Sequence, residues 1–282
     1  MAALEKTLQL WRLLSATWLL AGRKQVSLIA AGVAFFGMFA LFPGMAAIIA
    51  IFGLVADPFV VTEQLDLMAD IIPTDAYDLF SGQIQRLLSA QSRTLGWTTF
   101  VSIMLALWSS RAGVAALMGG LNAIAGVAPR NGIWQAVVAF GLTICLVSLA
   151  VVALFAVVIA PVVLAFVPLA GATVWLLEGL RWIIALGVLL LALGLLYKYG
   201  PAPSGQRGRW FTVGAFVTVV LWIGASAGLS YYLTNFGSYN EVYGSIGAVI
   251  GLLLWLYVSA YLILLGAALN TQVHRNSAQP TA

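Results

Sequence analysis

The chain has 282 residues, of which 62% are hydrophobic and only 8% are charged. A soluble domain is typically about 45–50% apolar and about 25% charged, so no soluble fold could hide this much apolar surface, and the composition predicts a protein whose solvent is lipid. The net charge of +4 does not indicate a nucleic-acid partner, because the basic residues lie near the ends of apolar runs, where they set membrane topology.

Residues 1–26 are predicted to form an amphipathic helix that lies in the membrane interface. Leu4, Leu8, Trp11, Leu14 and Trp18 recur at helical spacing, and polar residues cluster on the opposite side. Tryptophan favours the depth of the lipid headgroups, so this apolar face is expected to lie against the membrane.

Residues 27–272 are predicted to form an all-α, polytopic membrane domain with about six transmembrane helices, followed by a polar tail at 273–282. The spans are expected at about 27–56, from about 94 onward, and at about 133–167, 174–199, 210–235 and 244–271. The first span is longer than the roughly 20 residues that a bilayer needs, so it is expected to tilt, bend or protrude, and Pro43-Gly44 is the expected place for a bend.

Residues 57–93 interrupt this domain with a long polar segment that carries six of the nine acidic residues. Its apolar residues keep a helical rhythm on both sides of Pro73, which predicts two amphipathic helices on the external face. The acids are expected either to form a solvated face or to attract cations to the mouth of a pathway.

Arg111 leaves two alternatives open for the second span. It lies 17 residues after Thr94, so it could reach the far interface, and residues 112–127 would then form a re-entrant or interfacial helix. Alternatively the helix continues, and Arg111 faces the interior of the bundle.

The basic residues support a topology with both termini in the cytoplasm. This topology places Arg86, Arg93 and Arg181 outside, while Arg111 is ambiguous. The cytoplasmic side then receives nine basic residues: Lys6, Arg12, Arg23, Lys24, Arg130, Lys198, Arg207, Arg209 and Arg275. This asymmetry agrees with the positive-inside rule.

Four stretches together resemble a known family: AAGVAFFGMFALFP at 30–43, LWSSRAGVAALMGGLNAI at 107–124, LYKYGPAP at 196–203, and YGSIGAVIGLLLWLYVSAYLILLGAALN at 243–270. The chain is similar to the YihY/BrkB family of bacterial inner-membrane proteins, whose members are often mislabelled ribonuclease BN. The resemblance implies six helices, a location in the bacterial inner membrane and a role described as transporter or permease, without established catalytic residues. The family's last motif usually reads GAELN, whereas this chain has Ala268 at the acidic position, which puts any role of that acid in doubt.

Six residues are expected to bind a substrate: Arg111, Asn122, Ser226, Ser230, Tyr231 and Asn235. Arg111 could hold an anionic group such as a lipid phosphate, or it could anchor the helix end. Asn122 shares a face with Arg111 if the helix continues, but it could instead form an interhelical hydrogen bond. The residues from Ser226 to Asn235 make a polar stripe that could frame an external vestibule, or could serve an aromatic belt and helix packing.

Three further features have structural interpretations. Glu178 and Arg181 are spaced to form an ion pair on one helix face. Gly224 and Gly228 form a small-xxx-small pair that allows close helix approach. Cys145 is expected to be a small buried hydrophobe.

No enzymatic activity, cofactor or metal site is expected. A metal-dependent nuclease needs clustered histidine and carboxylate ligands, whereas the cytoplasmic side offers Glu5 and His274. The expected function is transport of an amphipathic or anionic solute, including lipid, and the alternative is a non-catalytic scaffold that supports envelope assembly. The expected partners are membrane lipids, further copies of the chain, and envelope proteins bound through residues 57–93; nucleic acid is not among them.

Overall fold

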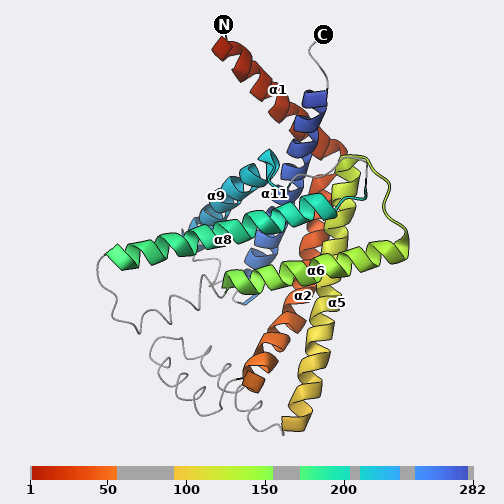
Figure 1. Cartoon of the computed structure of the whole chain (residues 1–282), viewed down its shortest axis with the longest axis vertical. Helices are drawn as coiled ribbons and strands as arrows, with labels where there is room; N and C mark the ends of the chain where they lie inside the picture. Colours follow the sequence, from red (N-terminus) through yellow and green to blue (C-terminus); the bar gives the residue numbers. More distant parts are fainter. Residues whose placement is uncertain (1, 56–91, 155–171, 204–209, 236–244, 279–282) are drawn as a thin grey trace. The chain divides into compact units, whose positions relative to one another are not determined.

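A computed structural model describes residues 2–55, 92–154, 172–203, 210–235 and 245–278 (Figure 1). These residues form helices and no strands, which confirms the prediction of an all-α protein. The helices are α1 (Ala2–Arg23), α2 (Val26–Val55), α5 (Ser92–Ala125), α6 (Gly132–Leu154), α8 (Ala172–Tyr199), α9 (Val213–Asn235) and α11 (Ser245–Ala278).

The number of apolar spans agrees with the prediction of about six. Within the described ranges, five helices are long and apolar enough to cross a membrane, or six if the bent pair α1–α2 counts as one span. Their large apolar side chains are widely exposed, as in Ile133 at 83% and Trp175 at 82%. Soluble monomers rarely expose large contiguous apolar patches, so these surfaces are suited to lipid.

The chain divides into two compact units, one formed by Met1–Gly37 with Arg111–Ala282 and the other by Met38–Ser110. The first unit contains three buried apolar clusters. The largest joins four helices through Leu20, Ala21, Val26, Ala30, Val33, Leu117, Leu121, Ile124, Ala260, Leu264, Ala267 and Ala268. The second joins α5 to α6 through Val114, Met118, Ala139 and Leu142. The third joins α8 to α9 through Leu193, Ala215 and Val219.

Ala268 stands at the position where the resemblance implies an acid. Its side chain is fully buried in the largest apolar cluster, which includes Leu264 and Ile124. A carboxylate in such surroundings would cost free energy unless it found a partner. The methyl group of alanine therefore suits the apolar packing of this chain.

A break between α1 and α2 lies at the predicted boundary between the interfacial helix and the first span. Pro43-Gly44 falls inside α2, whereas the segments Thr7–Arg23 and Val26–Ala40 meet at an angle of 63°. Gln25 adopts a φ of 51° at this junction, a left-handed conformation that interrupts the helical hydrogen bonds. This junction separates the predicted interfacial helix at 1–26 from the first span, and a bend at Pro43-Gly44 within α2 stays a prediction.

The structure resolves the two alternatives for residues 112–127, because α5 continues without interruption to Ala125. Gly126, with a φ of 73°, ends the helix, and its N–H and that of Val127 donate to the Asn122 carbonyl at 2.9 and 3.1 Å. A left-handed glycine is a common helix terminator, since it lacks the Cβ that disfavours this conformation.

Two boundaries differ by three residues or more from the expected spans. Helix α9 begins at Val213 instead of Trp210, because Thr212 caps it and its Oγ1 accepts from the Ala215 N–H at 3.2 Å. Helix α11 continues to Ala278, seven residues past the expected end of the last span. The outer part of the expected third span, at 155–167, and most of the predicted insertion, at 57–91, lie outside the described residues.

Candidate functional site

Arg111 is the charged residue farthest from the ends of its candidate span among the described spans. It lies in the span Ile103–Ala125, eight residues after the start and fourteen before the end. Every other charged residue in the described spans lies within six residues of a span end. With a rise of about 1.5 Å per residue, Arg111 is about 12 Å from the nearer end. Of the two alternatives, the structure has the one in which the helix continues past Arg111.

The side chain of Arg111 is half-buried, and its Nε atom is fully buried. The next residues pack against two other helices of the same unit. A Cβ added at Gly113 would lie 3.8 Å from the Phe36 Cβ of α2, and Val114 is buried against α6. The turn that begins at Arg111 is therefore held between α2 and α6, and this packing fixes the position of the Arg111 backbone.

Asn122 is 3% exposed, and its Oδ1 accepts a hydrogen bond from the Ala202 N–H at 2.7 Å. Its partner belongs to the loop between α8 and α9, not to another helix. The other amide atom, Nδ2, is buried and makes no hydrogen bond within the described part of the chain. Asn122 thus fastens the end of α5 to the α8–α9 loop, and this contact is different from the shared cavity with Arg111 that the sequence suggested.

The predicted polar stripe on α9 contains half-buried and exposed side chains. Ser226 Oγ accepts from Trp255 Nε1 of α11 at 3.3 Å, which is an interhelical contact as one of the two interpretations expected. Ser230 and Tyr231 are exposed, Tyr231 at 73%. Asn235 is the last residue of α9, and its side chain lies outside the described ones.

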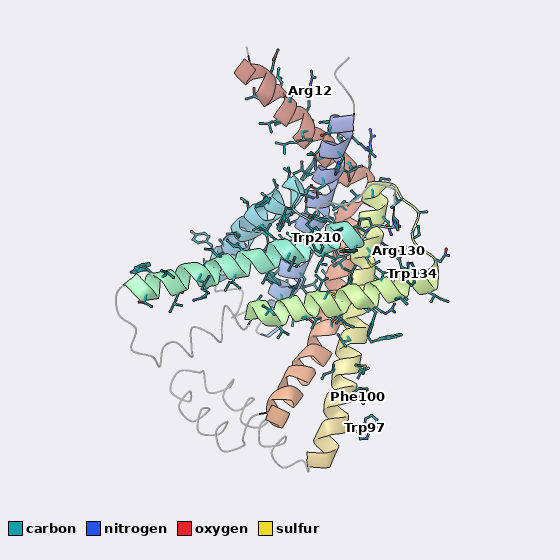
Figure 2. All side chains as sticks on the ribbon, viewed as in Figure 1. Arg12, Trp97, Phe100, Arg130, Trp134 and Trp210 are labelled. Atoms are coloured by element: carbon teal, nitrogen blue, oxygen red, sulfur yellow. The ribbon has the colours of Figure 1, made fainter. Side chains whose placement is uncertain are left out.

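A polar contact that the sequence did not predict joins Arg130 to the end of α8 (Figure 2). Arg130 Nη1 donates to the Gly200 carbonyl at 2.9 Å, and Nη2 donates to those of Tyr199, at 3.0 Å, and Pro201. A helix leaves its last carbonyls without partners, and a cation near them is favourable. Partial burial lowers the pKa of Arg130 from its ordinary value, but an arginine stays protonated in proteins.

Aromatic contacts support the same end of α8. The Lys198 ammonium lies 4.3 Å from the centroid of the Trp210 ring and 5.3 Å from that of Tyr199. The two rings meet edge to face with centroids 5.8 Å apart. Such cation–π and aromatic contacts hold the end of α8 close to Trp210, which precedes α9.

Asn270 fastens the start of α9 to α11. Its Oδ1 accepts from the Gly214 N–H at 2.8 Å, and its Nδ2 donates to Thr212 Oγ1 at 2.9 Å. The first N–H groups of a helix have no partners within the helix, so a side chain from α11 here acts as a cap.

Next to this cap, α9 and α11 cross closely at a glycine. A Cβ added at Gly266 would overlap Thr218 Oγ1, Tyr197 Oη and the Gly214 carbonyl. Tyr197 Oη donates to the Ile263 carbonyl at 2.8 Å and lies 3.1 Å from Thr218 Oγ1. Gly266 therefore makes room for a buried polar contact between α8, α9 and α11.

The three structural predictions had different outcomes. Arg181 Nη1 lies 3.0 Å from Glu178 Oε2, which confirms the ion pair. A Cβ at Gly224 or Gly228 would meet nothing within 4 Å, so close approach occurs at Gly266 and not at this predicted pair. Cys145 is exposed, so the prediction of burial was wrong. An apolar residue in a span can face lipid and need not be covered by protein.

We define the loop site as Asn122, Arg130 and residues 199–203. Asn122 belongs to the second stretch of the family resemblance and residues 199–203 to the third, while Asn270, from the fourth, caps the helix that follows the loop. Arg130 and Asn270 were not among the predicted site residues, since Arg130 was assigned to topology. The signal that could have indicated them is the presence of polar residues in or beside these stretches.

Comparisons with known proteins identify the family of this chain. A family model described as Virulence factor BrkB matches residues 17–282. The ribonuclease-like protein YfkH of Bacillus subtilis (strain 168) is 29% identical over 255 residues, which cover 89% of this chain and 90% of that protein. No solved structure matches the chain.

Two UPF0761 membrane proteins are also similar. The one from Tolumonas auensis is 37% identical over 92 residues, or 33% of this chain and 29% of that protein. The one from Xanthomonas oryzae pv. oryzae is 29% identical over 262 residues, or 90% of this chain and 58% of that protein. The chain thus spans only part of the length of these two relatives. Because the family model covers all but the first 16 residues, the protein belongs to the BrkB family of membrane proteins.

Proposed function

We propose that this protein is a multi-pass transporter of the bacterial inner membrane that moves an amphipathic, anionic solute, with phospholipid as the first candidate. The observation that carries the proposal is the position of Arg111 inside the apolar span Ile103–Ala125. An arginine at the centre of a membrane helix costs about 2.5–3.5 kcal/mol on insertion scales, and charged residues at such depths usually mark a pathway.

The chemistry of Arg111 suits an anionic headgroup. A guanidinium can form two parallel hydrogen bonds to a phosphate, and such charge-assisted pairs are stronger than neutral ones. The half-buried side chain emerges where α5 packs against α2 and α6, so one part of it is anchored by protein.

The surface of the described spans suits the acyl chains of the same solute. Apolar side chains on α6, the neighbour of the Arg111 turn, are exposed, as in Val137 at 53% and Ile144 at 43%. A phospholipid could place its phosphate at Arg111 and keep its chains against such surfaces. We therefore favour a lipid over a small soluble anion.

The proposed orientation has both termini in the cytoplasm. Basic residues accompany α1, the connection to α6, the α8–α9 loop and the end of α11, as in Arg23, Arg130, Lys198 and Arg275. The positive-inside rule assigns this set to the cytoplasm, which would place the loop site there.

Binding of anionic phospholipid tests the role of Arg111. Purified protein would be delipidated, and retention of phosphatidylglycerol against phosphatidylcholine would be measured by native mass spectrometry. A charge-assisted pair contributes about 1.5–3 kcal/mol, so Arg111→Ala is expected to weaken phosphatidylglycerol binding by about 10- to 150-fold. Arg275→Gln, which changes an exposed arginine in the last turn of α11, serves as the control. Equal retention by Arg111→Ala and the parent would exclude the proposed site.

A scaffold that supports envelope assembly is the second candidate function. It is favoured by the acidic segment 57–93, which carries six of the nine acidic residues of the chain. Deletion of residues 62–92 separates the two functions. Loss of partner capture with lipid movement intact would support a scaffold, whereas loss of lipid movement alone would support a transporter.

A further inference from the structure

Helix α1 has one face that packs on the rest of its unit. Thr17, Leu20 and Ala21 are at most 8% exposed, and the last two belong to the largest apolar cluster. Gln272 Nε2 of α11 donates to the Ala16 carbonyl at 3.3 Å. The second half of α1 is therefore held against α11 along this face.

A second face of α1 is apolar and exposed. It carries Leu8, Trp11, Leu14 and Trp18, whose exposed fractions are 49%, 70%, 56% and 65%. Steps of three to four residues place these side chains along one side of a helix. Two large tryptophans on one exposed stripe are typical of a helix whose apolar side lies at the depth of lipid headgroups.

The direction of α1 is compatible with a position on the membrane surface. The segment Thr7–Arg23 makes an angle of 63° with the apolar segment Val26–Ala40. If α2 crosses the bilayer, a helix at this angle to it lies nearer to the membrane plane than to the membrane normal. α1 would then run along the surface beside the entry of α2.

The charge of the segment indicates which lipid it would meet. Residues 1–26 contain Lys6, Arg12, Arg23 and Lys24 against a single acid, Glu5. Arg12 and Arg23 are exposed, and Figure 2 shows Arg12 on the part of α1 nearer the N-terminus. Basic residues near a membrane surface are attracted to anionic lipids and gain little from zwitterionic ones.

We propose that α1 docks on the anionic leaflet through Leu8, Trp11, Leu14 and Trp18, while α11 holds the face that carries Thr17, Leu20 and Ala21. The partner is a lipid surface rich in a headgroup such as phosphatidylglycerol. This inference does not rest on the proposed transport function, since it concerns only α1 and its packing on α11.

The test uses the full chain in lipid vesicles. The single native cysteine is removed as Cys145→Ser, and one new cysteine is introduced as Trp11→Cys, Trp18→Cys or Gln9→Cys. Each variant carries an environment-sensitive fluorophore in vesicles of phosphatidylcholine with or without phosphatidylglycerol. Quenching by a spin-labelled lipid and by aqueous iodide is then compared. Gln9 is exposed on the polar side of α1 and is the matched control.

The lipid quencher is expected to reach positions 11 and 18, whereas iodide is expected to reach position 9. Neutralising Arg12 or Arg23 with glutamine should lower the ratio of docked to undocked helix about fivefold per charge in anionic vesicles. Equal iodide quenching at all three positions would overturn the proposal. Shielding of positions 11 and 18 from both quenchers would also overturn it, because protein would then cover this face. An unchanged ratio in the charge variants would overturn the assignment to an anionic leaflet.

Discussion

Replacing Arg130 by glutamine is expected to loosen the loop site. The change removes a guanidinium that donates to the carbonyls of Tyr199, Gly200 and Pro201. Buried hydrogen bonds to charged groups contribute about 1.5–3 kcal/mol each, but these carbonyls can be partly rehydrated, so we take about 1 kcal/mol for each bond. The loop should then open more easily by about 2–3 kcal/mol.

Cysteine labelling measures this opening directly. Ala202 is 8% exposed, so Ala202→Cys in the Cys145→Ser background should react with a maleimide only when the loop opens. When opening and closing are fast relative to labelling, the rate follows the population of the open form. An increase of 2–3 kcal/mol in favour of opening corresponds to labelling about 30- to 150-fold faster.

Two further substitutions separate the geometry of Arg130 from its charge. Arg130→Lys keeps the charge but cannot reach three carbonyls together, so its labelling rate should lie between those of the parent and the glutamine variant. Arg275→Gln changes an exposed arginine and should leave the rate unchanged. If Ala202→Cys reacted with the maleimide no faster in the Arg130→Gln variant than in the parent, the three contacts would not hold the loop, and the reasoning would be refuted.

Two stability predictions follow from the crossing of α9 and α11, and unfolding by dodecyl sulfate in mixed micelles measures both. Gly266→Ala should destabilise the protein by about 1–3 kcal/mol, because the new Cβ overlaps Thr218, whereas Gly228→Ala, which meets nothing within 4 Å, should be neutral or slightly stabilising. Equal effects of the two alanines would contradict the close crossing. Asn270→Ala should cost about 1–2 kcal/mol, because it uncaps the Gly214 N–H, and Asn270→Asp, which keeps an acceptor, should recover part of this loss. An aspartate variant no more stable than the alanine one would argue against the cap.

The helices could be predicted from apolar runs, because in lipid every backbone polar group has to be satisfied within the segment. Helix α8 begins at Ala172, two residues before the expected start, and ends at Tyr199 as expected. The boundary near residue 26 was predicted, but the angle between α1 and α2 was not, since it depends on the backbone conformation of Gln25. The exposure of Cys145 was missed because a rule for soluble cores was applied to a protein solvated by lipid.

The candidate site was only partly predictable. Arg111 could be singled out, because a charge in an apolar run is costly wherever the helix packs. For Asn122 the sequence offered substrate binding or an interhelical hydrogen bond, whereas its hydrogen-bond partner is a loop N–H 80 residues away in the chain. Contacts of this kind, like those of Arg130 and Gly266, depend on which segments pack together, and local spacing does not contain that information.

Lipid movement in vesicles tests the transport proposal most directly. The protein would be reconstituted with fluorescent phosphatidylglycerol, and a membrane-impermeant quencher would be added outside the vesicles. The loss of fluorescence as labelled lipid moves from the inner to the outer leaflet would be followed in time. Faster exchange with the parent and with Arg275→Gln, but not with Arg111→Ala, is the result that the proposal predicts. Exchange that Arg111→Ala leaves unchanged, or no acceleration by the parent, would contradict it.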